Sequence, residues 1–405
     1  MMLGFLLARA GVEVVILEKH ADFLRDFRGD TVHPSTLEVM HELGLLDKFL
    51  TRPHDEIREL RGMVGDTELV LANFRHVPCR CKFIALMPQW DFLDFLCEEA
   101  GRLPTFRLIR NAEVTGLLGH ADVVTGVKVS TPEGPMEITA DLVIGADGRR
   151  STVRSAARLV VHDLGAPIDV LWMRLPRAPG DPSNTGGRIV PGAFMAMIDR
   201  RSYWQCAYVI AKGGMAGIQA RGLETFRADL VKVAPFFADR VQTLASWDDI
   251  KLLSVTVDRL ERWYMPGLLC IGDAAHAMSP IGGVGINLAI QDAVAAANIL
   301  ALPLADVSLP ASALTPFLAK VEKRRLFPAR VTQAAQVAVQ NRLLKPVIAS
   351  GGADGAPAVA MTVPWPLKLL SRSSWLQALP AYAVGVGVRP EHVHSPQKTT
   401  SAVQP

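Results

Sequence analysis

The sequence has 405 residues, and its 49% hydrophobic and 20% charged residues give the balance of a globular protein with a sizeable core. Its 43 basic and 40 acidic side chains leave a formal net charge of +3, which argues against a nucleic-acid partner and against an anionic membrane surface. The five cysteines are scattered and odd in number, so they predict neither a disulfide framework nor a metal site, and they favour a cytoplasmic location.

The pattern of the N-terminal residues indicates the second half of an α/β unit. Residues 2–10 are mostly apolar and predict a helix that ends at Gly11. Residues 12–17 are mainly aliphatic and β-branched, as in a strand buried on both faces, and Glu18 closes this run. Because a crossover helix joins two parallel strands, we expect the sheet to be truncated at its first strand.

Helix and strand patterns then alternate up to about residue 150. Helices are predicted over 34–50 and 89–101. An antiparallel meander is predicted from three alternating segments, 105–118, 123–130 and 135–139. Residues 140–144 predict another buried strand.

A second domain is predicted from about residue 155, where Pro, Gly and Trp become more frequent. A helix is predicted over 222–234. Strand-like runs occur at 169–175, 193–198, 203–211 and 251–259. The pattern predicts an antiparallel sheet, on which Tyr203 and Trp204 are candidates for lining an aromatic pocket.

The following part returns to the α/β pattern. Residues 267–271 predict a buried strand, 286–301 a helix, and 315–345 a long helix bent at Pro328.

Two stretches near the C-terminal end, 355–367 and 373–388, carry no charge. Each is shorter than about 18 residues and contains proline, which argues against a membrane span and disfavours membrane contact. Residues 391–405 predict a frayed tail.

The strongest functional signal lies in residues 268–287. A buried strand delivers Asp273 to the carboxyl edge of a sheet, where open α/β sheets bind ligands. A loop with Gly282, Gly283 and Gly285 then opens a helix. Glycines let the backbone approach a planar ring, and a helix N-terminus adds about half a positive charge. A tight strand-to-helix turn without a ligand is the alternative interpretation.

A second signal lies in residues 141–148, another strand that ends in a Gly-flanked carboxylate, Asp147-Gly148. On its own this pattern also suits a surface turn. Its pairing with the Gly272-Asp273 motif favours one shared ligand site.

These two motifs, in this order, resemble the aromatic-hydroxylase group of FAD-dependent monooxygenases, the para-hydroxybenzoate hydroxylase type. The resemblance covers residues 2 to about 390. It implies that Gly272 and Asp273 hold the ribityl chain of FAD and that Asp147 and Gly148 serve FAD and nicotinamide contacts. The isoalloxazine ring would be cradled by a glycine-rich segment, through Pro280, Gly282, Gly283, Gly285, Ile286 and Asn287.

Three further positions match the family. Glu18 would accept the adenosine ribose hydroxyls, Arg28 would lie near the flavin and pyrophosphate, and Gln89 would contact FAD. Taken singly, each also fits a purely structural role. For His276 a packing or hydrogen-bonding role is favoured over that of a base.

One feature departs from the family. Its opening strand and Gly-x-Gly-x-x-Gly loop bind the FAD pyrophosphate, and that glycine spacing occurs nowhere in this sequence. We expect a misassigned start or a truncated product. The first is favoured, because unsatisfied buried groups beside a missing strand cost about 1–3 kcal/mol each, against total stabilities of about 5–15 kcal/mol.

The implied fold is α/β, a Rossmann-like FAD-binding domain truncated at its first strand with an inserted antiparallel-sheet substrate domain. The FAD-binding domain would be discontinuous, over 1–60, 83–155 and 265–345. The substrate domain would comprise 61–82 and 156–264, followed by a helical segment over 346–390 and the tail.

The implied function is NAD(P)H- and FAD-dependent hydroxylation of a phenolic or polycyclic small molecule with O2, through a flavin C4a-hydroperoxide. Alternatives in the same superfamily are a quinone-precursor hydroxylase and a halogenase, although a Trp-x-Trp-x-Ile segment is missing from the sequence. A non-catalytic remnant unable to hold FAD is the alternative from another class. The resemblance leaves a homodimer open.

Overall fold

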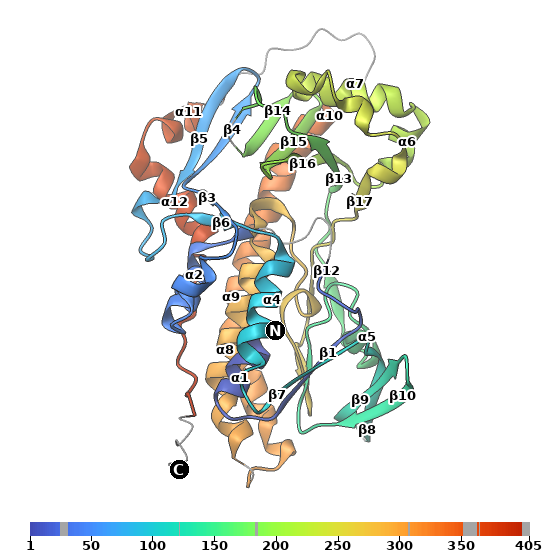
Figure 1. Ribbon diagram of the computed structural model, residues 1–405, viewed down its shortest axis with the longest axis vertical. Helices are drawn as coiled ribbons and strands as arrows, with labels where there is room; N and C mark the ends of the chain where they lie inside the picture. Colours follow the sequence, from blue (N-terminus) through green and yellow to red (C-terminus); the bar gives the residue numbers. More distant parts are fainter. Residues whose placement is uncertain are drawn as a thin grey trace.

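The computed structural model describes residues 1–24, 31–120, 122–182, 185–306, 308–350, 363 and 365–398. Figure 1 shows an elongated molecule with two parts. The lower part combines parallel strands with long helices, and the upper part is built on a large, mostly antiparallel sheet.

The lower part contains two separate groups of parallel strands. In the first, β1 (Val14–Glu18) pairs with β7 (Phe106–Arg110), and α1 (Met2–Arg9) precedes β1. In the second, β11 (Val143–Gly145) pairs with β20 (Leu268–Cys270). The strand β19 (Tyr264–Met265) adds to β20 in the antiparallel sense. Parallel pairing under helices confirms the Rossmann-like α/β class.

The antiparallel meander is shorter than the sequence predicted. It consists of β8 (Glu113–His120), β9 (Val123–Thr131) and β10 (Gly134–Thr139). Residues 105–118 were expected to belong to it as one segment, but their first half is β7. The reason is a tertiary contact, because β7 finds a parallel partner in β1 with Val14 opposite Phe106.

Long helices cover the parallel strands. The most buried is α8 (Gly285–Ala305), which packs against α1 and α9 (Thr315–Val339). Residues Ile281–Ala305 are long and apolar enough to cross a membrane, but 56% of the most apolar window is buried inside the fold, as in a core helix. The other helices of the lower part are α4 (Gln89–Ala100) and the short α5 (Thr152–Ala156), whereas α10 (Lys345–Ala349) packs against the sheet of the upper part.

The upper part is a seven-stranded sheet of order β17-β13-β16-β15-β14-β4-β5. Its central strands are β13 (Ile168–Pro176), β16 (Tyr203–Ala211), β15 (Ala193–Asp199) and β14 (Gly186–Val190). The helix α7 (Leu223–Val233) covers one face of the sheet and buries Phe226 and Leu230 there. The short helix α6 (Met215–Ala220) precedes α7 in the sequence. The sheet also takes in β4 (Glu59–Val64) and β5 (Thr67–Asn73) from much earlier in the chain.

Residues 251–259, expected as one strand, form two short ones. β17 (Lys251–Leu253) joins the edge of the seven-stranded sheet. β18 (Asp258–Leu260) pairs instead with β12 (Val161–Asp163), in the lower part. The chain therefore passes from one part of the molecule to the other within this segment.

A small antiparallel sheet connects the two parts. Its order is β2 (Thr31–Val32), β6 (Ile84–Leu86) and β3 (Asp55–Ile57). The helix predicted over 34–50 is divided into α2 (Pro34–Glu42) and α3 (Leu46–Phe49). Gly44 lies between them with φ +70°, a left-handed conformation that ends α2.

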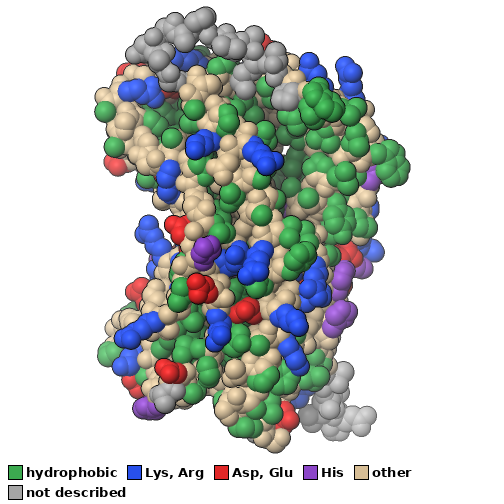
Figure 2. All heavy atoms as spheres, turned by 180° about the vertical axis from the view of Figure 1, so that it is seen from behind, with side chains coloured by type: hydrophobic (Ala, Val, Ile, Leu, Met, Phe, Trp, Pro, Cys, Tyr) green, Lys and Arg blue, Asp and Glu red, His purple; other side chains and the backbone are tan. Residues whose placement is uncertain are grey.

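The C-terminal region packs on the outside of β5 through α11 (Trp365–Ser371) and α12 (Ser374–Gly385), where hydrophobic side chains are exposed (Figure 2). Residues 391–398 differ from the frayed tail that was expected. Glu391 is buried and pairs with Arg325 at 3.1 Å, and the Lys398 amide donates to Arg9 O at 2.9 Å. Charge pairing, which local composition does not reveal, holds this segment; residues 399–405 lie outside the described part.

Candidate functional site

The glycine-rich segment forms a tight turn of backbone between β20 and α8. Gly282 and Gly283 adopt φ +77° and +62°, which side-chain-bearing residues rarely do. A Cβ atom on Gly283 would lie 2.4 Å from Thr31 Oγ1. The loop therefore requires glycine for both conformation and space, and α8 starts directly behind it at Gly285.

The Asp147-Gly148 motif lies beside the Gly272-Asp273 loop, with which the sequence predicted one shared ligand site. Gly145 at the end of β11 is opposite Cys270 at the end of β20, so the loops that follow share one edge of the sheet. Arg149 and Asp273 join the two loops, with Arg149 Nη2 3.6 Å from Asp273 Oδ2. The predicted meeting of the two motifs is thus present in the structure.

The carboxylate of Asp147 is used within its own loop. Its Oδ1 accepts from Ser151 Oγ at 2.5 Å, and its Oδ2 accepts from the Val153 amide at 3.1 Å. These bonds fix the start of α5 and the turn at Gly148, where φ is +84°. In this structure Asp147 orders the loop that presents Arg149.

Arg149 offers an unused donor at the site. Its Nη1 is buried and has no hydrogen-bond partner among the described residues. A buried guanidinium N–H without an acceptor is costly, and an oxygen-bearing ligand would satisfy it. The first N–H groups of α8 also have no partner within the helix, and they point along its positive end. A glycine turn without side chains, an arginine donor without an acceptor in the described part of the chain, and a helix N-terminus together fit a flat ring with an oxygen-rich chain, as in FAD.

Asn287 clamps the glycine loop to β2 and α2. Its Oδ1 accepts from the His33 amide and from Thr36 Oγ1, both at 2.8 Å. Its Nδ2 donates to Thr31 O at 3.0 Å and to Gly283 O at 3.2 Å. Asn287 was predicted to contact the isoalloxazine. In the structure its side chain uses its hydrogen bonds to hold the glycine loop in shape.

A buried charged network lies behind Gly272 and Asp273. Asp292 is fully buried; its Oδ2 accepts from the Gly272 amide at 3.0 Å and contacts His276 Nε2 at 2.5 Å. Its Oδ1 accepts from Arg325 Nε at 2.9 Å. Burial by itself raises the pKa of Asp292, but His276 and Arg325 outweigh it and hold the pKa below its usual value. His276 thus has the hydrogen-bonding role that the sequence favoured.

The other predicted residues are more dispersed. Glu18 closes β1, in the group of parallel strands separate from β11 and β20, and its Oε1 accepts from the His20 amide at 3.0 Å. Gln89 opens α4. Pro280 precedes the glycine turn and Ile286 lies in the first turn of α8. Arg28 lies outside the described residues.

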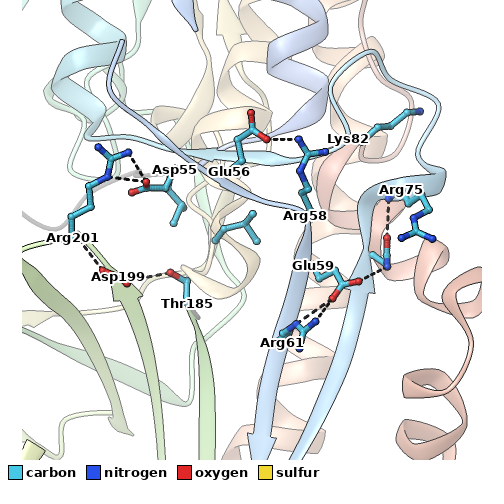
Figure 3. A pocket seen from close by; sticks show the side chains of 13 residues that line it. Asp55, Glu56, Arg58, Glu59, Arg61, Arg75, Lys82, Thr185, Asp199 and Arg201 are labelled. Atoms are coloured by element: carbon cyan, nitrogen blue, oxygen red, sulfur yellow. Dashed lines mark hydrogen bonds and ion pairs between the residues drawn. The ribbon is translucent and has the colours of Figure 1, made fainter. Parts of the chain in front are cut away.

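A cavity of about 650 Å³ lies between the small sheet and the seven-stranded sheet (Figure 3). Leu86 lines it and pairs with Thr31, the residue that touches Gly283, so one strand separates the cavity from the glycine loop. The rim carries ion pairs that Figure 3 shows, including Arg201 with Asp55 at 2.7 Å. The remaining lining is mostly charged or polar: Glu56, Ile57, Arg58, Glu59, Arg61, Asn73, Arg75, Lys82, Thr185 and Asp199.

Several residues of the site escaped prediction from sequence. Thr31, His33 and Asp292 carry no motif of their own. A signal existed for Asp292, because Gln291 and Asp292 interrupt an otherwise apolar helix pattern and a buried charge needs partners. Among the described residues, no group of three or more His, Cys, Asp or Glu side chains is placed to hold a metal ion.

Two parallel strands each end in a glycine–carboxylate loop at one edge of the sheet. This geometry defines a nucleotide-cofactor-binding α/β protein. The chain belongs to the FAD binding domain family, which residues 1–333 match. It is 33% identical over 311 residues to 6-methylpretetramide 4-monooxygenase of Streptomyces rimosus, covering 74% of this chain and 72% of that protein. The predicted resemblance to FAD-dependent aromatic monooxygenases is confirmed, and the protein is an oxidoreductase.

The solved structures agree on the fold. The probable FAD-dependent monooxygenase PqsL of Pseudomonas aeruginosa matches with a TM-score of 0.68 at 22% identity, covering 86% of this chain and 94% of that chain. The anhydrotetracycline hydroxylase OxyS of Streptomyces rimosus matches with a TM-score of 0.70 at 24% identity, covering 95% and 73%. The chain spans 57–61% of the length of several other curated relatives, such as rifampicin monooxygenase of Streptomyces venezuelae at 60%.

Proposed function

We propose that the protein binds FAD at the sheet edge formed by the Gly272-Asp273 and Asp147-Gly148 loops, and that it hydroxylates a phenolic or polycyclic aromatic molecule with NAD(P)H and O2. One observation carries this proposal. The glycine loop before α8 turns through two positive-φ glycines and is shaped by Asn287, while Arg149, which pairs with Asp273, has a buried donor without an acceptor among the described residues. Such a surface suits the ring and the polar chain of a flavin.

The chain's own residues would bind and orient the cofactor. Asp273 and Arg149 would contact the hydroxyl and phosphate oxygens of the FAD chain, because one accepts and the other donates hydrogen bonds. The positive end of α8 would favour the reduced, anionic ring over the neutral one. When bound, FAD would supply the activation of O2 along the route that the family resemblance implies.

The cavity is our candidate for the substrate's approach. Its volume lies within the range of about 300–1,000 Å³ that is usual for small-molecule sites. Only strand β2 separates it from the glycine loop, because Thr31 of β2 pairs with the lining residue Leu86 and donates to Gly283 O, and this would bring a bound ring toward the flavin. The charged rim suits a substrate with several polar substituents, such as a hydroxylated polycycle. The name of 6-methylpretetramide 4-monooxygenase supports this class of substrate.

The proposal is tested by adding phenols and polycyclic phenols to the FAD-loaded protein and following NAD(P)H consumption. We expect one or more compounds to accelerate it and to gain one oxygen atom that derives from labelled O2. An Asp273→Ala protein serves as the control and should be inactive. Stimulation only by quinone precursors, or a halide-dependent product, would favour the alternative activities.

Failure to load FAD at all would favour a non-catalytic protein instead. A cytoplasmic location stays a prediction, which cell fractionation would test. A homodimer is left open, and light scattering would test it. A comparison of NADH with NADPH would identify the reductant.

A further inference from the structure

The two C-terminal helices expose an unusual set of large apolar side chains. Figure 2 shows hydrophobic side chains gathered over this region. Trp365, Trp375 and Leu379 are 75%, 74% and 71% exposed. We define the C-terminal surface by its exposed members, Trp365, Leu369, Trp375, Leu376, Leu379 and Tyr382.

Helix α12 is oriented opposite to an ordinary surface helix. Its buried residues are Gln377, Ala381 and Gly385, and a Cβ on Gly385 would come within 2.8 Å of Phe74. Small and polar side chains therefore face the protein, and the large apolar ones face outward. A surface helix normally packs its apolar face on the core. An outward apolar face needs another apolar medium to cover it.

One of the exposed rings is held in place. The indole of Trp375 stacks on the imidazole of His76, with ring centroids 4.4 Å apart and planes 12° apart. Trp and Tyr are enriched where a protein meets the membrane–water interface, because each combines an apolar ring with a polar group. Three of the six members of the C-terminal surface are of these two types.

The charges around this surface are one-sided. Residues 355–390 contain Lys368, Arg372 and Arg389 and no Asp or Glu. The hairpin of β4 and β5 brings Asp66 and Glu68 near, but each has an arginine partner, Arg188 at 3.6 Å and Arg61 at 3.2 Å. The overall charge of +3 argued against an anionic membrane, yet the distribution of that charge is uneven and this face is basic and apolar.

A second copy of the chain is a poorer fit than a membrane. A twofold contact through the C-terminal surface would place Lys368 and Arg372 against the same residues of the other copy, without an acidic side chain in the segment to neutralise them. Anionic lipid headgroups would neutralise both cations and admit the indole rings.

We infer that the C-terminal surface docks on a lipid bilayer that contains anionic lipid. The apolar side chains of α11 and α12 enter the headgroup boundary, and Lys368 and Arg372 pair with lipid phosphates. This inference does not depend on the proposed function, because it concerns a different face of the protein and needs no cofactor.

The test is flotation of the full-length protein with vesicles of phosphatidylcholine, with and without phosphatidylglycerol. We expect binding to anionic vesicles, weakened at least about tenfold by high salt or by Lys368→Gln with Arg372→Gln. A triple variant, Trp365→Ser, Trp375→Ser and Leu379→Ser, should lose binding and keep its far-UV circular dichroism. The matched control, Leu302→Ser with Phe327→Ser, alters two side chains that are 68% and 54% exposed elsewhere and should bind as the wild type does.

A second readout locates the contact. Brominated lipid should quench the fluorescence of the wild type and leave that of the triple variant unchanged. The inference is overturned if the wild-type protein stays unbound, or if the control variant loses binding equally. It is also overturned if light scattering shows that the triple variant only converts a dimer into a monomer.

Discussion

Acidification from neutral pH toward pH 4 should destabilise the protein through His33. This ring is fully buried; its Nδ1 lies 2.8 Å from Val384 O, and its Nε2 has no partner among the described residues. Burial lowers the pKa of His33 from 6.5 to about 4, although the bond to Val384 opposes the change. Between these two pKa values the unfolded chain takes up a proton that the folded protein does not. The free energy of unfolding therefore decreases as the pH is lowered.

The size of the effect follows from the two pKa values. The difference between 6.5 and about 4 corresponds to about 3 kcal/mol of unfolding free energy, lost progressively over this pH range. That is a large part of a typical total of about 5–15 kcal/mol. Urea denaturation at several pH values measures it, with unfolding followed by tryptophan fluorescence.

The matched variant is His33→Asn, whose amide can still donate to Val384 O but cannot take up a proton. We expect its stability to change much less between pH 6.5 and 4 than that of the wild type. His20→Asn, at an exposed position, should keep the wild-type dependence. If His33→Asn keeps the full dependence, buried His33 is not the cause and the reasoning is refuted.

Asp292→Asn removes the charge that faces buried Arg325 and should lower the free energy of unfolding in urea by about 3–5 kcal/mol; an unchanged midpoint would contradict the network. Gly283→Ala places a methyl group 2.4 Å from Thr31 Oγ1, so FAD should bind at least about tenfold more weakly in a fluorescence titration, and equal affinity would exclude the proposed cradle. Arg201→Ala removes an exposed ion pair with Asp55 at the cavity; it should raise KM for the aromatic substrate and leave FAD affinity unchanged, and an unchanged KM would separate the cavity from the substrate.

The chain offers controls for the first two of these variants. Asp66→Asn changes a fully exposed aspartate near Arg188 and should leave the urea midpoint unchanged. Gly65→Ala changes a glycine that also has a positive φ, +57°, but meets nothing within 4 Å. It should not affect FAD binding, which separates backbone strain from loss of the cradle.

The local parts of the site could be predicted from the sequence. The strand before Asp273, the glycine loop and the helix after it are contiguous, so one stretch of residues contains all the determinants. The same holds for Asp147-Gly148. The sequence also predicted one shared site for the two motifs, and the structure supplies the reason, because β11 and β20 are neighbouring parallel strands whose carboxyl ends lie at one edge.

Features that depend on distant partners could not be predicted. Thr31 and Asn287 are 256 residues apart, and nothing local shows that one shapes the loop of the other. The strand β4 was missed because nearly all of its residues are half-buried. Its sequence therefore lacks the clear alternation of apolar and polar residues that indicates a strand. The segment from Glu391 was taken for a tail because the partner of Glu391, Arg325, lies far away in the sequence, on α9.

The central claim is that the loops at Asp273 and Gly283 hold FAD. Its most direct test is the visible absorption spectrum of the purified 405-residue chain after incubation with FAD and desalting, measured beside Asp273→Ala. We predict flavin absorbance equivalent to one FAD per wild-type chain and much less in the variant. A colourless wild-type protein, or a variant that retains equal flavin, would contradict the claim.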